Sequence, residues 1–210
     1  MKLMPRIFKL VAIIVLPVFC LSGVDVYNVE ADRLANLMHW KQGDVIAEIG
    51  AGQGQMSFSA AVLVGAAGHV FATELDDKKI DHLKEEVQSK SFQNVTIIKG
   101  DPIATNLPDA CCEAIFMRRV YHHFPNPERT DAALFRDLKP GGLIAIIDFP
   151  PRSGLPPVEG APKNHGGHGV PREVLVEELK AAGFQIVNEL NDWPEQDYCV
   201  IARKPTQGIQ

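Results

Sequence analysis

The sequence has few cysteines, and their arrangement excludes a disulfide framework. Four occur in 210 residues; Cys20 lies in an apolar N-terminal segment, and the others are Cys111, Cys112 and Cys199. An odd number with two adjacent members matches neither the even set of a disulfide-stapled secreted domain nor the spacing of a zinc site. We interpret Cys112 and Cys199, which fall in predicted strands, as small buried apolar side chains.

The sequence also lacks any run of lysine or arginine. It has 21 Lys and Arg against 26 Asp and Glu, and a formal net charge of -5. Nucleic-acid-binding domains usually gather basic side chains on one face, so this composition disfavours nucleic acid as a partner. Hydrophobic residues make up 46% and charged residues 22%, which is typical of one globular domain with a single core.

The apolar run at 10–21 is too short for a membrane-spanning helix, which needs roughly 20 apolar residues. Three basic residues precede this run, and no acid occurs before Asp25. These features predict a signal peptide or a short membrane anchor over 1–23, and a folded domain over 24–205. If 1–23 acts as a signal, the protein is exported or membrane-associated; otherwise it is cytoplasmic.

Helical and extended patterns alternate after residue 24. Helices are predicted at 31–40, 55–64, 77–89, 127–138 and 171–182, and strands at 45–49, 69–73, 95–98, 113–117, 143–148, 184–189 and 198–202. This order predicts a doubly wound α/β fold with a mostly parallel, seven-stranded sheet. The last two strands have no helix between them, so one is expected to run antiparallel. The irregular stretch 149–170 predicts a lid or mobile loop.

The most informative motif is EIGAGQG at 48–54, where a predicted strand gives way to a helix. Glycines there let the backbone turn sharply and approach a ligand that a side chain would block. The G-x-G-x-G spacing differs from the G-x-G-x-x-G of nicotinamide dinucleotide folds. Glu48 would repel a pyrophosphate but attract a cationic amino acid. The motif therefore fits S-adenosylmethionine, which carries an ammonium and a sulfonium and no phosphate.

Two further acids follow the next two predicted strands. Glu74 closes the second strand, and Asp101 follows the third. In nucleoside-binding α/β sheets, a carboxylate at the first of these places accepts hydrogen bonds from the ribose hydroxyls. Asp101 is placed to accept one from the adenine amino group. Together with the glycines, three acids after three successive strands predict one site, in preference to unrelated solvated acids.

Four segments resemble, in order and spacing, the blocks of class I S-adenosylmethionine-dependent methyltransferases: VIAEIGAGQG, VFATELD, IIKGDP and LKPGGLIAIIDF. The resemblance covers roughly 27–203 and implies a Rossmann-like methyltransferase fold with S-adenosyl-L-methionine as cofactor. The resemblance implies that Glu48, Gly50, Ala51 and Gly52 contact the methionine part of the cofactor, with Gly54 in the same block. It implies that Glu74 contacts the ribose and that Leu75 lies beside the adenine. It also implies that Asp101 meets the adenine amine, with Pro102 next to it. More narrowly, VYHHFPNPE, the His- and Gly-containing loop and VPRE resemble a bacterial group of methyltransferases, without indicating a substrate.

The segment after the fourth predicted strand, MRRVYHHF at 117–124, departs from the Asn-Pro-Pro-Tyr-like segment of many amino-methylating members. This disfavours methylation of adenine, cytosine or glutamine. His122 and His123 are candidates for a general base toward a hydroxyl or thiol; alternatively, one of them caps or packs at the start of the next helix. Arg118 or Arg119 either pairs with an acidic substrate or is solvated.

The histidines of NHGGHG, His165 and His168, are too few for a closed metal site, and no metal is predicted. They belong either to a lid that touches substrate or to a simple glycine-rich loop. The predicted function is methyl transfer to a small-molecule acceptor through O, S or N. Two alternatives stay open: a non-catalytic binding protein of the cell envelope that keeps the fold, and an NAD-dependent oxidoreductase. Neither the acceptor nor the oligomeric state follows from the sequence.

Overall fold

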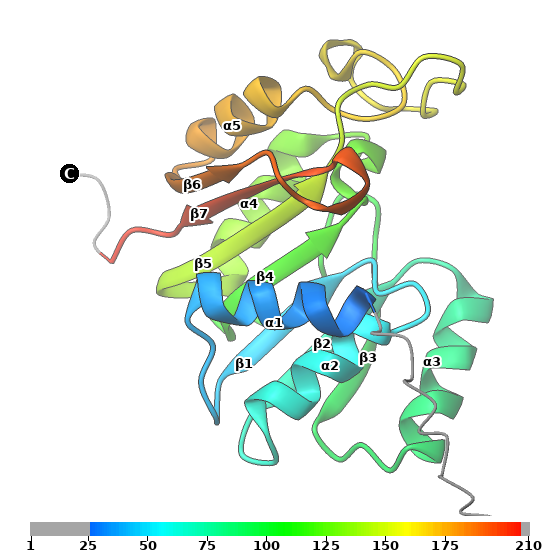
Figure 1. Cartoon of the computed structure of the whole chain (residues 1–210), viewed down its shortest axis with the longest axis vertical. Coiled ribbons are helices and arrows are strands. Elements are labelled where there is room, and N and C mark those ends of the chain that lie inside the picture. The colour runs from blue at the N-terminus through cyan, green and yellow to red at the C-terminus, as the bar shows by residue number, and fades with distance from the viewer. Residues whose placement is uncertain (1–25, 207–210) are drawn as a thin grey trace, which may run out of the picture.

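The computed structural model describes residues 26–206, so the predicted signal or anchor at 1–23 lies outside the described residues (Figure 1). The helices are α1 Val26–Met38, α2 Gln55–Val64, α3 Asp77–Ser89, α4 Pro127–Asp137 and α5 Arg172–Ala181. The strands are β1 Val45–Ile49, β2 His69–Glu74, β3 Val95–Lys99, β4 Cys112–Arg118, β5 Leu138–Asp148, β6 Gln185–Leu190 and β7 Tyr198–Arg203. Three short 3₁₀ turns complete the set: η1 Tyr121–His123, η2 Lys163–His165 and η3 Pro194–Gln196. No helix within 26–206 has the length and apolar character needed to cross a bilayer.

The seven strands form one sheet in the order β3-β2-β1-β4-β5-β7-β6. Strands β1 to β5 pair in parallel, whereas β7 is antiparallel to both β5 and β6. The predicted doubly wound sheet with an antiparallel C-terminal strand is therefore confirmed. Strand order reverses between β1 and β4, and the carboxyl ends of strands beside such a reversal form a ligand-binding crevice in α/β proteins.

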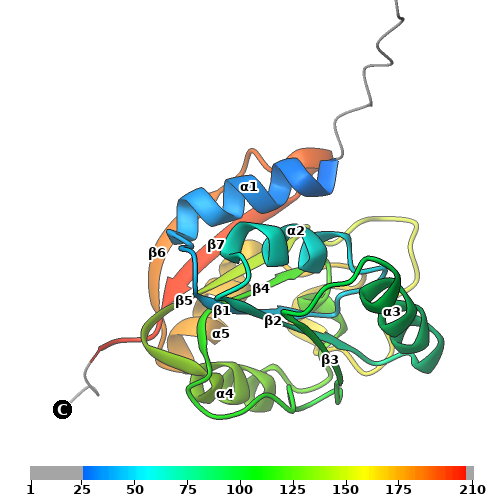
Figure 2. The same cartoon turned by 90° about the horizontal axis from the view of Figure 1, so that it is seen from below.

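The core has one layer on each face of the sheet. Helices α1 and α2 lie on one face and α4 and α5 on the other (Figure 2). Strand β5 serves both layers: Ile144 and Ile146 face α4 and α5, while Ala145 and Ile147 face α1 and α2. Because both faces are covered, the strand is a continuous apolar run. Cys112 and Cys199 are fully buried in these layers, as predicted.

The fifth strand begins earlier than the sequence predicts. The Lys-Pro-Gly-Gly segment at 139–142 was expected to separate helix from strand, but α4 ends at Asp137 and β5 starts at Leu138. The register shifts between Cys112, which pairs with Leu138, and Ala114, which pairs with Leu143. The segment is thus a bulge within the strand, and Gly141 adopts a φ of 83° there.

Candidate functional site

A pocket of about 330 Å³ opens at the carboxyl ends of β1, β2 and β4. This volume lies within the range of small-molecule sites. A larger groove of about 710 Å³ runs between α4 and α5, away from these strand ends. The residues that line the smaller pocket are Ile49, Gly50, Gly52, Thr73, Glu74, Leu75, Lys79, Gly100, Asp101, Ala104, Arg118, Arg119, Val120, His123 and Phe124.

Gly52 forms part of the wall and has a left-handed backbone, with a φ of 58°. A Cβ atom added there would meet nothing within 4 Å, so a side chain at this position would extend into open space at the pocket. Gly54 differs because a Cβ atom there would lie 2.5 Å from Leu83 Cδ2 and 2.8 Å from the Phe58 ring. Gly54 therefore serves the packing of α2 against α3, and it does not line the pocket.

Glu74 is held in place by backbone amides. Its Oε2 accepts a hydrogen bond from the Gly52 N–H (2.9 Å), and its Oε1 accepts from the N–H groups of Leu75 (2.7 Å) and Asp76 (3.1 Å). The Lys79 ammonium lies 3.9 Å away. An ionised carboxylate has about four lone-pair sites, so the oriented group can still accept a hydrogen bond from a ligand hydroxyl.

Glu48 lies outside the pocket lining. It is buried on the α2 side of β1, where the Ser57 hydroxyl donates a hydrogen bond to its Oε2. Burial raises the pKa of Glu48 to about 8, so the group is largely protonated at neutral pH. The expectation that an ionised Glu48 faces a cationic ligand directly is therefore not met by this arrangement.

The remaining predicted residues divide into two groups. Gly50, Leu75 and Asp101 line the pocket with Gly52 and Glu74. Asp101 is exposed, and its Oδ1 accepts a hydrogen bond from the Ile103 N–H at 2.9 Å. Ala51 is buried beside the pocket and Pro102 is exposed outside it; neither contributes to its lining.

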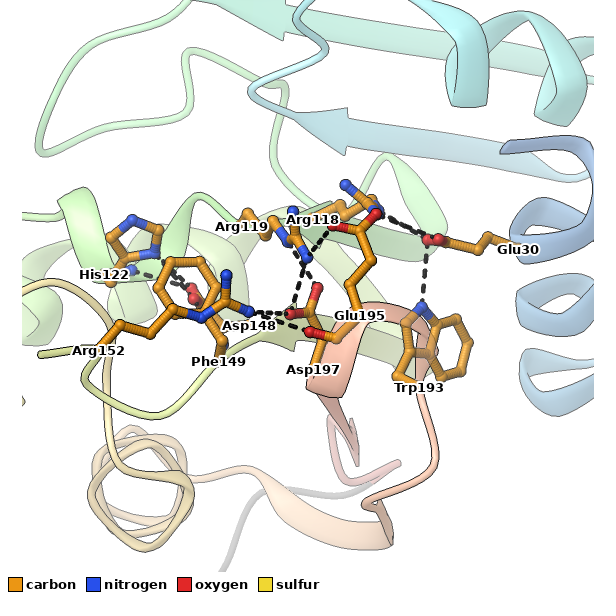
Figure 3. A network of polar contacts seen from close by, with 10 residues as sticks. All are labelled: Glu30, Arg118, Arg119, His122, Asp148, Phe149, Arg152, Trp193, Glu195 and Asp197. Atoms are coloured by element: carbon orange, nitrogen blue, oxygen red, sulfur yellow. Dashed lines mark hydrogen bonds and ion pairs between the residues drawn. The ribbon is translucent and has the colours of Figure 1, made fainter. Parts of the chain in front are cut away.

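Arg118, at the end of β4, joins the pocket to α1 through an ion pair that sequence reasoning missed (Figure 3). Its Nε donates to Glu30 Oε2 at 2.7 Å, and its Nη2 donates to Glu30 Oε1 at 3.2 Å. Trp193 Nε1 donates to the same Glu30 Oε2 at 3.1 Å. Glu30 is almost completely buried, so this bidentate pair supplies most of its hydrogen bonding.

Arg119 forms the second part of the network. It donates from Nε to Asp197 Oδ2 at 2.6 Å and from Nη2 to Asp197 Oδ1 at 3.0 Å. These bonds raise the pKa of Arg119 above its ordinary value. Arg152, at the start of the 149–170 loop, donates to Asp197 Oδ1 at 3.1 Å and lies over the Phe149 ring (Figure 3). The arginines that line the pocket are thus paired with buried protein acids instead of being solvated.

His122 and His123 follow β4 in η1 and differ in environment. His122 is buried, and its Nδ1 lies 2.8 Å from Asp148 Oδ1 and 3.0 Å from Asp148 Oδ2. His123 lines the pocket, and burial followed by the neighbouring His122 lowers its pKa. Neither residue caps α4, because Asn126 accepts the capping hydrogen bond from the Arg129 N–H.

Tyr121 points into a second polar cluster, which anchors the loop. Its hydroxyl lies 2.8 Å from Asp131 Oδ2 and 2.9 Å from Glu178 Oε2, and His165 Nε2 lies 3.1 Å from the same Glu178 atom. Burial raises the pKa of Asp131 to about 7. His165 thus ties the loop to α5, whereas His168 lies 5.3 Å from His122 between ring centroids.

Comparison with known proteins identifies the type of domain. A family model described as a methyltransferase domain matches 47–146. A protein-L-isoaspartate O-methyltransferase of Ignicoccus hospitalis is 30% identical over 57% of this chain and 51% of its own length. An arsenite methyltransferase of Halobacterium salinarum is 29% identical over 69% of this chain and 38% of its own length. The matched regions therefore span about half or less of these relatives. A solved methyltransferase structure from Aquifex aeolicus shares the fold, with a TM-score of 0.70, 23% identity, and coverage of 83% of this chain and 89% of that chain.

Proposed function

The chain belongs to the class I S-adenosylmethionine-dependent methyltransferases, and on that premise we propose that it transfers a methyl group to a small-molecule acceptor. The observation that carries the proposal is the pocket where Gly52, Glu74 and Asp101 meet from three successive strand ends. Its place beside the strand reversal is where this fold class binds nucleotide-like ligands.

The lining residues fit S-adenosylmethionine by their chemistry. The oriented Glu74 carboxylate would accept hydrogen bonds from the ribose hydroxyls, with Leu75 beside the adenine. Asp101 would accept from the adenine amine. Gly50 and Gly52 would admit the methionine part close to the backbone, because a side chain at Gly52 would extend into the pocket. Glu48, behind this wall, would act on the ligand without direct contact, through the negative charge that it gains when a bound cation lowers its pKa.

The protein's contribution to methyl transfer is mainly positional. When bound, the cofactor supplies a sulfonium methyl group as the electrophile for an in-line displacement. The strand-end residues would fix its orientation, and the 149–170 loop, anchored by His165 and Arg152, would limit access of water. Holding two reactants in line converts a bimolecular encounter into an effectively unimolecular step.

The similarity does not specify the acceptor, because the two relatives are named for different ones, a protein isoaspartate and arsenite. The acceptor can be sought by incubating the protein and methyl-labelled S-adenosylmethionine with a metabolite extract. We expect a labelled product heavier than its precursor by one methylene. The Gly52→Arg variant, whose side chain would fill the pocket, serves as the control. Transfer that persists in this variant would contradict the assignment of the pocket.

The N-terminal segment favours a second candidate, a non-catalytic envelope protein that keeps the fold and binds a ligand in the same pocket. A basic start followed by a short apolar run supports export or membrane association through 1–23. Cell fractionation with N-terminal sequencing of the mature protein tests this localisation. A mature chain that begins near residue 24 in an envelope fraction supports export, and an intact cytoplasmic chain rejects it.

A further inference from the structure

His122 Nε2 is one of five buried side-chain nitrogen and oxygen atoms without a hydrogen-bond partner within residues 26–206, and it is the one that lies beside the candidate site. This nitrogen is inaccessible to solvent. Leaving a polar atom buried without a partner costs free energy, so such atoms are uncommon and often mark a place where a ligand supplies the missing group. An unpartnered nitrogen beside a candidate active site is therefore a place where a bound ligand would supply the hydrogen-bond partner.

Asp148 determines which proton His122 carries. This fully buried carboxylate accepts hydrogen bonds from the backbone N–H groups of His122 (3.1 Å) and Phe149 (2.9 Å), and it contacts His122 Nδ1 with both oxygens. An ionised carboxylate can accept hydrogen bonds but cannot donate one, so the proton in this contact must be on Nδ1. In the neutral ring, Nε2 is then left with the free lone pair. The dyad therefore presents a hydrogen-bond acceptor.

The dyad lies beside the pocket. Its two members come from the segment just after β4 and from the last residue of β5, two neighbouring parallel strands. The His122 ring centroid is 4.1 Å from that of His123, which lines the pocket. On the loop side, the ring centroids of Phe149 and His168 lie 4.8 and 5.3 Å from the ring centroid of His122. An acceptor molecule that enters between the pocket and the loop would come close to Nε2.

Resting on the proposed function, we propose that His122 Nε2 is the general base for methyl transfer, that Asp148 is its positioning residue, and that the acceptor bears a hydroxyl or thiol. His123 lines the pocket but is less suited to this role, because no side-chain carboxylate within residues 26–206 hydrogen-bonds its ring. A neutral amine can attack before it loses a proton, so an oriented base serves chiefly an oxygen or sulfur nucleophile.

The reaction needs no reactant beyond the acceptor and S-adenosylmethionine. The acceptor oxygen or sulfur gives an electron pair to the methyl carbon while its O–H or S–H proton passes to His122 Nε2. The bond from that carbon to the sulfonium breaks, and its electron pair stays on the sulfur as a neutral thioether. The imidazolium that forms is stabilised by the Asp148 carboxylate. It would return its proton to solvent when the products leave and the loop residues Phe149 and His168, which pack against the ring, move aside.

The test uses the full chain with S-adenosylmethionine and a fixed set of acceptor probes: phenol, 4-nitrophenol, benzenethiol and benzylamine. Formation of S-adenosylhomocysteine is measured at a pH where 4-nitrophenol is ionised and phenol is not. We expect transfer to phenol, whose hydroxyl is still protonated at this pH; benzenethiol, like 4-nitrophenol, is already ionised there and needs no base. We also expect kcat toward phenol to fall about 100-fold or more in His122→Gln and Asp148→Asn, with the calorimetric Kd for S-adenosylmethionine unchanged.

The loss should be much smaller for 4-nitrophenol, because an acceptor that is already ionised needs no base. A purely structural role for the dyad would reduce kcat equally for both phenols, and that result would overturn the proposal. His69→Gln, on β2 away from the dyad, is the matched control and should retain full activity. Transfer to benzylamine alone, or to none of the probes while the cofactor still binds, would also overturn it.

Wild-type protein alone provides a second measurement if either variant fails to fold. With a general base in place, the rate across a series of phenols should follow total phenol concentration. Without one, it should follow the phenolate fraction, and that outcome would contradict the proposal. Absence of cofactor binding to the wild-type chain would instead reject the proposed function, which keeps the two failures distinguishable.

Discussion

The Glu74 carboxylate accepts a hydrogen bond from the backbone N–H of Gly52, with 2.9 Å between Oε2 and N. This bond joins the end of β2 to the loop that follows β1. Because the same carboxylate also accepts from the N–H groups of Leu75 and Asp76, its orientation is set before a ligand arrives. Glu74, the residue predicted to bind the ribose, and the predicted glycine loop are therefore one structural unit.

Replacing Glu74 with Gln is expected to weaken S-adenosylmethionine binding. The amide nitrogen cannot accept from an N–H group, so either the loop contact or a ligand hydroxyl loses its partner. Hydrogen bonds to charged groups contribute about 1.5–3 kcal/mol, which corresponds to a Kd increase of roughly 10- to 100-fold. Calorimetry checks this, with the exposed Glu85→Gln on α3 as control. Equal affinities for the two variants would contradict the role of Glu74.

Binding of the cofactor is expected to release a proton from Glu48. The pKa of this buried group is about 8 in the unliganded protein, so it is mostly protonated at neutral pH. A cation bound nearby favours the carboxylate and lowers that pKa. Titration calorimetry in buffers of different ionisation enthalpy measures the release, which should vanish in Glu48→Gln. Binding heats that do not depend on the buffer would assign Glu48 a structural role with Ser57.

Much of the fold and part of the site follow from sequence pattern. Five helix-separated strands predict the parallel sheet, and Glu74 and Asp101 reach one edge because parallel strands end there together. The buried position of Glu48 could have been predicted from the sequence. Side chains alternate along a strand, and Ile46, two residues before Glu48, packs on the face covered by α1 and α2. A strict period of two puts Glu48 on that face too.

The ion pairs behind the pocket had no local signal. Arg118 and Glu30 are 88 residues apart, and Arg119 and Asp197 are 78 apart. Only the packing of α1 and η3 against the end of β4 brings these side chains together. The unpartnered His122 Nε2 is likewise a property of tertiary burial, although the His122 side chain itself was a predicted candidate.

Asp131 is expected to make stability depend on pH. Its pKa is about 7 in the folded protein, above the ordinary value of 3.8. Between these values the unfolded chain loses a proton that the folded protein keeps. The unfolding free energy therefore falls as pH rises through this window, by up to about 1.4 kcal/mol per pH unit, and levels off above it.

Denaturant unfolding of wild-type protein and Asp131→Asn across this pH range checks the prediction. The variant should lose this component of the pH dependence, so its stability relative to wild type should improve as pH rises from 4 to 7. The contribution of Glu48 has the same sign but is common to both proteins, so it cancels in the difference. Parallel curves for the two proteins would contradict the raised pKa.

Asp197 is expected to be critical for stability. Its buried carboxylate pairs with both Arg119 and Arg152, so Asp197→Ala leaves Arg119 only its ion pair with Glu195 and Arg152 only its bond to the Glu195 carbonyl. Breaking a buried ion pair typically costs about 3–5 kcal/mol of unfolding free energy. Arg119 and Arg152 are 24% and 39% exposed, so we expect a smaller loss here. Asp192→Ala removes an exposed pair with Arg33 and should change stability little. Similar unfolding midpoints for the two variants would contradict the role of Asp197.

The most direct test of the account is calorimetric titration of wild type, Gly52→Arg and Gly43→Arg with S-adenosylmethionine. Both glycines have a positive φ, 94° for Gly43 and 58° for Gly52, and open space around a Cβ atom, but only Gly52 lines the pocket. We predict binding near the micromolar range for wild type and Gly43→Arg, and none for Gly52→Arg. Equal binding by all three proteins, or no binding by the wild-type chain, would contradict it.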